Sequence, residues 1–337
     1  MAVTRVIFGC SSSQLTPDEL AFFKDIKPWG FILFRRNIVS RKQVSSLCNT
    51  LRSLTGRSDT PILIDQEGGR VQRMNSPVWN SYPSAGKLSE IYTLDPLRGR
   101  EIVRLTAQLI AEDLREVGIS VNCAPVLDVR TPEANPAVIG DRSFGMDADT
   151  VSILGRAFAE GLLAGSVLPV IKHMPGHGRA RVDSHECLPF VETSLKELEI
   201  TDFKPFYTLK DMPAAIPAHV VYTQCDSNAG TISPFIIQNI IRKKIGYNGL
   251  LITDDLSMNA LTGSLSERTA MALSAGCDIA LHCNGDMSEM VEVAQALLPL
   301  SEKSAQRAVK ALERISHFPE PINKKWAKAQ LVMHLTS

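Results

Sequence analysis

The sequence has no long hydrophobic run, no excess of charge of either sign and no closely paired cysteines. None of its apolar stretches reaches the roughly 20 residues needed to cross a bilayer, and the N-terminal MAVTRVIFGCSSS does not have the pattern of a signal peptide. Lys and Arg together number 36, as do Asp and Glu. We therefore expect no membrane and no nucleic acid as a partner, and we expect a cytoplasmic protein.

The cysteines also argue against a secreted protein. Their number, 7, is odd, and no two of them are three residues apart as in a CxxC motif. Cys10, Cys123, Cys277 and Cys283 lie in or beside apolar runs, which is typical of reduced cysteines in a core. With 44% hydrophobic residues in 337, the chain is predicted to be globular with a large core.

Short apolar runs alternate with longer amphipathic stretches along almost the whole chain. Because the runs are apolar throughout, they indicate strands that are covered on both faces, as in a parallel sheet. We predict eight strands, at Val3–Phe8, Gly30–Phe34, Pro61–Ile64, Ser120–Leu127, Val167–Ile171, Ala214–Pro217, Gly249–Thr253 and Asp278–Leu281. Eight strand and helix pairs in this length predict a (β/α)₈ barrel.

Helix-start signals support this alternation. Thr16, Pro17 and Glu19 form a capping box with a first-turn proline, and the longest helical pattern runs from Pro96 to Val117. No linker divides the chain, so we predict one catalytic domain over residues 1–337. Within it, residues 304–337 are expected to form a helical extension packed on the barrel, interrupted by Pro319 and Pro321.

Polar side chains follow six successive predicted strands. In barrels of this type the active site lies at the carboxyl ends of the strands, so these side chains are expected to share a pocket. They are Asp65 to Arg73, Asp128, Lys172 with His173, His219, Asp254 with Asp255, and His282 with Asn284. The donors and acceptors among them suit a sugar, and no glycine-rich phosphate loop is present.

The stretch from Lys172 to His185, KHMPGHGRARVDSH, is expected to be a loop that carries chemistry. Asp183 lies two residues before His185, close enough to orient that imidazole as a general acid. Two other interpretations remain open from this stretch alone. One is a metal site, although no HExxH spacing occurs, and the other is a loop whose polar side chains only cap its turns.

Cleavage of a glycosidic bond needs an anion on one side of the sugar and an acid beside the leaving oxygen. Asp254, at the end of the run LLIT, is the candidate nucleophile, and His185 is the candidate acid. A purely structural role for Asp254 would be to cap the segment that follows it. Asp255 is better placed for that role.

Seven motifs in chain order resemble the single-domain bacterial beta-N-acetylhexosaminidases of glycoside hydrolase family three. They are DQEGGRVQR, APVLDV, IGDRSFG, KHMPGHG, DSH, PAHVVY and ITDDLSM. The resemblance implies that Asp254 is the nucleophile, that His185 paired with Asp183 is the acid/base, and that no cofactor or metal is used. It also implies that Asp65, Arg73, Arg142, Lys172 and His173 bind N-acetylglucosamine.

The resemblance further implies a small-molecule substrate, a muropeptide or another molecule that contains N-acetylglucosamine, and a role in peptidoglycan recycling. We expect a monomer. Two features depart from the family pattern: Met174 stands where relatives commonly have Phe, and Arg179 and Arg181 add positive charge near the proposed acid/base. We also hypothesise that the loop is mobile, and that phosphate can compete with water as the acceptor, because a neutral imidazole does not repel an anion.

Two rival functions remain. The first is a metal-dependent hydrolase on the same barrel, with His173, His177, His185 and Asp254 as ligands. The second is a sugar-binding barrel without catalytic activity, which would require the nucleophile or the acid to be missing. Both are present in this sequence.

Overall fold

Eight parallel strands form a closed barrel, which confirms the predicted fold class. The structure, a computed structural model, describes residues 3–184 and 186–335. Around the barrel the strands follow the order β1-β12-β11-β9-β7-β6-β3-β2. Each barrel strand therefore pairs with the barrel strands that precede and follow it in the chain, and β1 pairs with β12 to close the barrel. The barrel strands are β1 Thr4–Gly9, β2 Pro28–Leu33, β3 Ile62–Ile64, β6 Val121–Asn122, β7 Leu168–Met174, β9 Ala214–Pro217, β11 Leu250–Asp255 and β12 Ile279–His282.

Two strands, β6 and β7, differ most in length from the prediction. Strand β6 ends at Asn122, and Pro125 beyond it has no N–H to donate to a ladder. The chain nevertheless stays beside β7, because the Ala124 and Pro125 carbonyls accept from the Val170 and Lys172 N–H groups and Val126 forms an isolated bridge with Lys172. Strand β7 continues to Met174. The expectation that Lys172 and His173 begin a loop was therefore wrong, and the two side chains are held by a paired strand.

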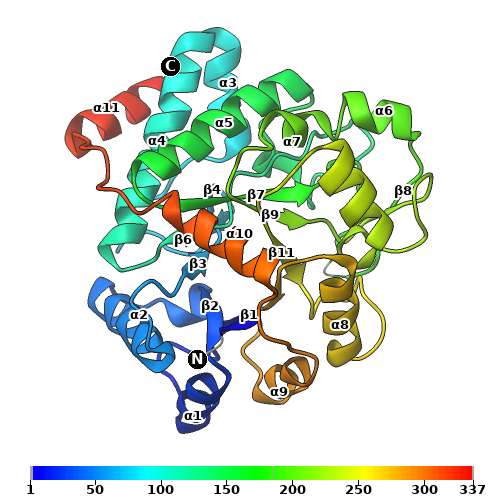
Figure 1. The fold of residues 1–337 in the computed structure, drawn as a ribbon. Helices are drawn as coiled ribbons and strands as arrows, with labels where there is room; N and C mark the ends of the chain where they lie inside the picture. Colours follow the sequence, from blue (N-terminus) through cyan, green and yellow to red (C-terminus); the bar gives the residue numbers. More distant parts are fainter. Residues whose placement is uncertain (1–2, 185, 336–337) are drawn as a thin grey trace.

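The helices surround the barrel (Figure 1). They are α1 Pro17–Ile26, α2 Arg41–Thr55, α3 Ala85–Leu94, α4 Pro96–Glu116, α5 Ala148–Ala164, α6 Leu195–Ile200, α7 Lys204–Thr208, α8 Leu265–Ala275, α9 Met287–Gln295, α10 Glu302–Glu313 and α11 Lys324–Leu335. A π-helix covers Ile236–Lys244. The capping box of Thr16 and Glu19 and the long helix from Pro96 are present as predicted.

Two small strand pairs lie outside the barrel. Strands β4 (Gln66–Gly68) and β5 (Val71–Gln72) form an antiparallel hairpin directly after β3. Strands β8 (Phe190–Val191) and β10 (Val221–Tyr222) pair in parallel. The first hairpin turns the chain back beside the end of β3, so that the side chains on both sides of the turn lie near the barrel mouth.

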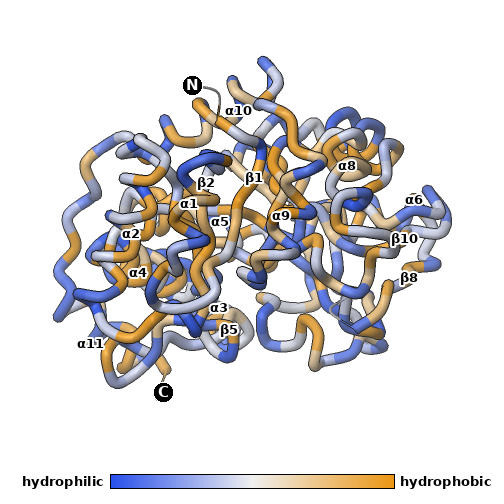
Figure 2. The backbone as a smooth tube through the Cα atoms, turned by 90° about the horizontal axis from the view of Figure 1, so that it is seen from below, coloured by the Kyte–Doolittle hydropathy of each residue, from blue (hydrophilic) through white to orange (hydrophobic). Residues whose placement is uncertain are grey.

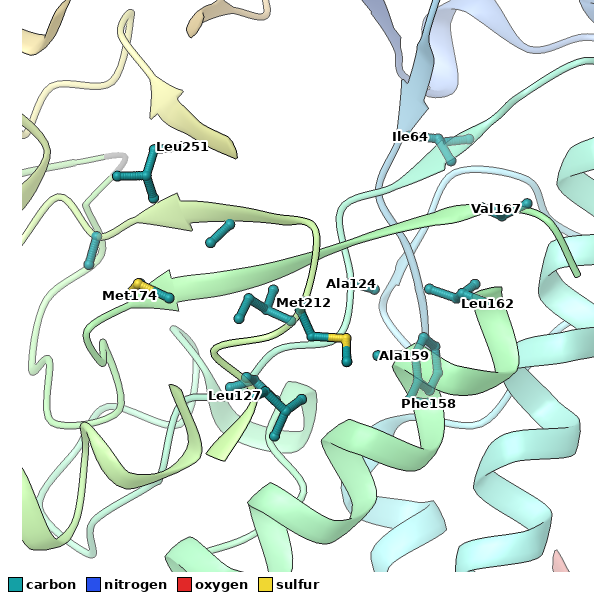
Figure 3. Close-up of a cluster of buried hydrophobic side chains, with 14 of the residues drawn as sticks. Ile64, Ala124, Leu127, Phe158, Ala159, Leu162, Val167, Met174, Met212 and Leu251 are labelled. Carbon is teal, nitrogen blue, oxygen red and sulfur yellow. The ribbon is translucent and has the colours of Figure 1, made fainter. Parts of the chain in front are cut away.

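Most of the apolar core lies between the strands and the helices. Phe158, Ala159 and Leu162 of α5 face Val167 and Ala124 in this layer (Figure 3). A second, smaller cluster fills the inside of the barrel and includes Ile7, Leu63 and Val170. Along the backbone, hydrophobic segments gather in the strands and the helices against them, whereas hydrophilic segments run along the outer loops (Figure 2).

Helix α10 lies across one end of the barrel (Figure 1). Its Ala308 and Ala311 belong to the inner apolar cluster, and Arg307 pairs with Asp278 at 2.9 Å, just before β12. Helix α11 packs on α4 and α3. No helix in residues 3–184 or 186–335 is long and apolar enough to cross a membrane. Helix α10 therefore covers the amino-terminal end of the barrel, opposite the carboxyl ends of the strands.

Candidate active site

A cavity of about 310 Å³ opens at the carboxyl end of the barrel. Seven of the eight predicted site residues line it: Asp65, Arg73, Arg142, Lys172, His173, Asp183 and Asp254. The eighth, His185, lies outside the described residues. The cavity is large enough for one monosaccharide, since small-molecule sites begin at roughly 300 Å³.

Buried ion pairs form the floor of this cavity. Lys172 Nζ lies 2.9 Å from Asp65 Oδ1 and 2.8 Å from Glu67 Oε1. Arg142 donates two hydrogen bonds to Glu67, both at 2.9 Å, and Arg73 donates to Asp65 at 3.0 Å. Three cations and two carboxylates are thus joined in one network that fixes every charged group.

The network keeps its members charged. Burial would raise the pKa of Asp65, but Lys172 and Arg73 outweigh it and hold that pKa well below its usual range. Burial would lower the pKa of Lys172, but Asp65 and Glu67 outweigh it and raise that pKa above its usual range. Arg73 Nε is buried and has no partner among the described residues. The guanidinium of Arg73 lies over the Phe34 ring, 5.4 Å from its centroid.

Asp254 lies at the end of β11 and borders the cavity. Its Oδ1 accepts a hydrogen bond from the backbone N–H of Asp255 at 2.9 Å. Burial raises the pKa of this carboxyl, but the nearby His219 and His173 rings outweigh it, so the pKa lies below the usual range. The side chain is therefore an ionised carboxylate at neutral pH, as a nucleophile must be.

His173 is oriented by Asp128, a fully buried residue. The ring Nδ1 lies 2.7 Å from Asp128 Oδ2, and the other carboxylate oxygen accepts from the backbone N–H groups of His173 and His177. His173 lowers the pKa of Asp128 enough to overcome burial. Because the carboxylate can only accept, Nδ1 carries the proton and Nε2 is left for a ligand.

The loop after β7 returns its tip to the cavity. Asp183 and Ser184 both border the cavity, and the Ser184 carbonyl accepts from the Ala260 N–H at 3.1 Å. Arg179 points to the other side, where it pairs with Asp202 at 2.8 Å and Glu197 at 2.9 Å. Met174 is buried in the apolar core between barrel and helices (Figure 3).

Several of the predicted rim residues do not line the cavity, among them Asp128, His219, His282 and Asn284. His219 is fully buried and contacts Thr231 Oγ1 and the Asp255 carbonyl, and His282 packs against Phe8. The residues of β9 and β12 that line the cavity are instead Ile216 and Leu281. Side chains alternate along a strand, so His282 points outward when Leu281 points inward. The prediction that six strands share polar groups in one pocket was wrong for these two strands.

Two site residues received no role from the sequence. Glu67 holds Arg142 and Lys172, and Asp128 holds His173. Both follow predicted strands, which placed them at the rim. Only the fold shows that each carboxylate lies against a cation or ring from a distant part of the chain.

No group of three or more His, Cys, Asp or Glu side chains in the described ranges is arranged to hold a metal ion. His173 and His177 have ring centroids 5.5 Å apart. Their nearest ring partners are Asp128 for the first and Ser184 for the second. The described members of the proposed metal set are thus engaged in hydrogen bonds within the protein.

Comparison with known proteins identifies the family. The model of the glycosyl hydrolase family 3 N-terminal domain matches residues 16–317. The chain belongs to glycosyl hydrolase family 3. It is therefore a glycoside hydrolase, and the catalytically silent alternative loses its support.

Relatives in this family align over nearly the whole chain. A beta-hexosaminidase of Idiomarina loihiensis is 34% identical over 97% of this chain and 99% of its own. The crystal structure of native NagZ from Neisseria gonorrhoeae is 31% identical, with a TM-score of 0.89 over 100% of this chain and 99% of that one. The same enzyme in complex with N-trifluoroacetyl-D-glucosamine has 31% identity and a TM-score of 0.89, with 99% coverage of both chains.

Proposed function

We propose that this family 3 enzyme is a retaining beta-N-acetylhexosaminidase that removes terminal beta-linked N-acetylglucosamine. The observation that carries the proposal is the ionised Asp254 carboxylate beside a one-sugar cavity with a network of fixed charges on its floor. The beta-hexosaminidases aligned over the full chain, and the N-acetylglucosamine analogue bound by the gonococcal enzyme, support the same substrate.

The proposed reaction has two steps. An Asp254 oxygen attacks the anomeric carbon while the bond to the leaving oxygen breaks, and the His185 imidazolium donates a proton to that oxygen. The neutral imidazole then takes a proton from water, whose oxygen displaces Asp254 from the anomeric carbon. Asp183 orients the imidazole in both steps. Two displacements at one carbon retain its configuration.

The fixed charges on the floor bind the sugar in this proposal. Asp65 and Arg73 lie side by side, as do Lys172 and Glu67, so each pair presents an acceptor and a donor to neighbouring hydroxyl groups. Arg142 and the free Nε2 of His173 complete the set. Because every group is already held by a partner, little reorganisation is needed when the sugar binds.

We place the reaction in the cytoplasm and take muropeptides that carry N-acetylglucosamine as the substrate, as in peptidoglycan recycling. All seven cysteines are free, which suits a reducing compartment. We expect a monomer. Turnover of purified anhydro-muropeptides, compared with chitobiose, tests the natural aglycone. An equal or higher kcat/KM on chitobiose contradicts the muropeptide assignment.

Trapping of the intermediate tests the chemistry. A fluorinated N-acetylglucosaminyl fluoride should leave a sugar on the peptide that contains Asp254, detected by mass spectrometry, and the first product should be the beta anomer by proton NMR. A label on another residue, an alpha anomer as the first product, or activity retained by Asp254→Ala overturns the assignment. Glycosyl phosphate formed in phosphate buffer would show that phosphate competes with water, and its absence rejects that hypothesis.

A further inference from the structure

The loop after β7 contains a second histidine that the proposed reaction does not use. His177 borders the cavity, yet only 2% of its surface is exposed. Its backbone N–H donates to Asp128 at 2.7 Å, which ties the start of the loop to the carboxylate that orients His173. Its ring lies beside the His173 ring, with centroids 5.5 Å apart. The residue is thus fixed by the sugar-binding side of the cavity.

The ring of His177 reaches the tip of the same loop. Its Nε2 lies 3.4 Å from Ser184 Oγ, and both side chains are buried. At 3.4 Å this is a long hydrogen bond, and substitution of either side chain would remove it. Burial and the neighbouring His173 lower the pKa of His177 to about 4. The ring is therefore neutral at physiological pH and can bond a hydroxyl without adding a positive charge to the loop.

Ser184 lies in the chain between Asp183 and His185, the two residues of the proposed acid pair. Its hydroxyl meets His177 on the β7 side, and its carbonyl accepts from Ala260 on the β11 side, six residues after the nucleophile. Ser184 is thus held from both sides of the cavity. A shift of this residue moves Asp183 with it, because the two share a peptide bond.

We infer that His177 is a positioning residue, which acts through Ser184 to hold the loop tip where the acid pair can reach the leaving oxygen. The inference rests on the proposed role of His185 as the acid. His177 does not touch the leaving group itself. Its loss should therefore weaken proton donation more than sugar binding or nucleophilic attack.

The test is the dependence of kcat/KM on the leaving group, measured with aryl N-acetyl-beta-glucosaminides of increasing phenol pKa. For His177→Phe, which keeps a ring of similar size, the loss on the poorest leaving group should be roughly ten- to a hundredfold. The loss on the most acidic phenol should be smaller, since protonation matters less there. Ser184→Ala should behave alike, and Ser184→Thr, which keeps the hydroxyl, should recover most of the loss.

The double variant His177→Phe/Ser184→Ala adds an independent measure. If both residues act through one contact, the double variant should be no worse than the more impaired single variant. His317→Phe is a matched control, because His317 also contacts a serine, Ser166, but on the exposed surface. It should leave the leaving-group dependence unchanged.

The outcomes separate two kinds of failure. Equal losses on all leaving groups, or additive losses in the double variant, overturn the positioning role of His177. If His185→Ala itself shows no leaving-group dependence, the acid assignment fails instead. If His177→Phe does not fold, Ser184→Ala and Ser184→Thr decide the question, since neither changes the buried ring.

Discussion

The strand wall of the cavity and its loop wall hold their side chains by different means. The strand wall is formed by Asp65, Lys172, His173 and Asp254 at the ends of β3, β7 and β11. Each of them is held by an ion pair or hydrogen bond of 2.7 to 3.0 Å to a neighbouring residue. The loop wall, of which the structure describes residues 175–184 and 186–187, is held near the cavity by the contacts of His177 and Ser184.

The difference follows from what each wall must do. In the proposed reaction the strand wall binds a sugar and supplies an anion, so its charges gain from being fixed before the substrate arrives. The loop wall would supply a proton to one oxygen and then take one from water, and it must also let the product leave. Strong buried pairs suit the first task, and a few replaceable contacts suit the second.

Removal of the nucleophile should have the largest effect. We expect Asp254→Ala to lower kcat by roughly 10⁴-fold or more on every leaving group, because the other carboxylates at the cavity are engaged elsewhere. Asp65 and Glu67 are paired with cations, and Asp255 accepts hydrogen bonds from Ser257 and the Cys283 N–H. His185→Ala on the loop wall should lose roughly 10²- to 10⁴-fold on a poor leaving group, and much less on dinitrophenol. Steady-state kinetics with two aryl substrates checks both. If Asp254→Ala and His185→Ala showed the same dependence on the leaving group, the two walls would not have separate roles.

Loss of Lys172 should test how far the strand wall depends on its charges. Lys172→Met leaves Asp65 and Glu67 buried without their shared cation. We expect the free energy of unfolding to fall by roughly 3–5 kcal/mol, measured by urea denaturation, and sugar binding to weaken as well. Arg156→Met breaks the half-exposed pair with Asp211 and should cost no more than about 1 kcal/mol. Equal losses of unfolding free energy in the two variants would show that the buried network on the cavity floor stabilises the protein no more than a half-exposed ion pair.

A methyl group at Gly178 should test the base of the loop wall. A Cβ at this position would lie 1.9 Å from the carbonyl oxygen of Val129, so the loop must shift. Gly178→Ala should therefore lower kcat/KM on a poor leaving group by roughly a hundredfold. Gly86→Ala is the control, because its new Cβ would meet Asp141 at an ordinary 3.4 Å. Unchanged kinetics in Gly178→Ala would show that the loop can move without penalty.

The two walls also differ in how well the sequence predicted them. The strand wall followed from the rule that barrel sites lie at strand ends, and the structure brings Asp65, Lys172 and Asp254 together there. The same rule wrongly included His282, which points away from the cavity because side chains alternate along β12. It also wrongly included His219, which lies beyond the end of β9 and is buried against Thr231. The partnership of Asp128 with His173 joins residues 45 apart in the chain, and the contact of His177 with Ser184 depends on the path of the loop. No local pattern encodes either contact.

The smallest expected effect is a pH dependence of stability that arises in the loop wall. The pKa of His177 is lowered to about 4 by burial and by His173, whereas a histidine in the unfolded chain has a pKa near 6.5. Between these values the unfolded chain binds a proton that the folded protein does not, so stability falls as the pH drops from about 6.5 to about 4. His177→Phe removes this contribution, and its free energy of unfolding should decline less over that range than that of the native protein.

The lowered pKa values of Asp65 and Glu67 affect stability in a separate pH range. Their contribution is present above about pH 4 and is lost below it. Urea denaturation at pH 7, 6 and 5 therefore isolates the histidine, with His317→Phe as the control for the loss of one imidazole. Parallel curves for His177→Phe and the native protein would mean that His177 is not held neutral in the folded loop.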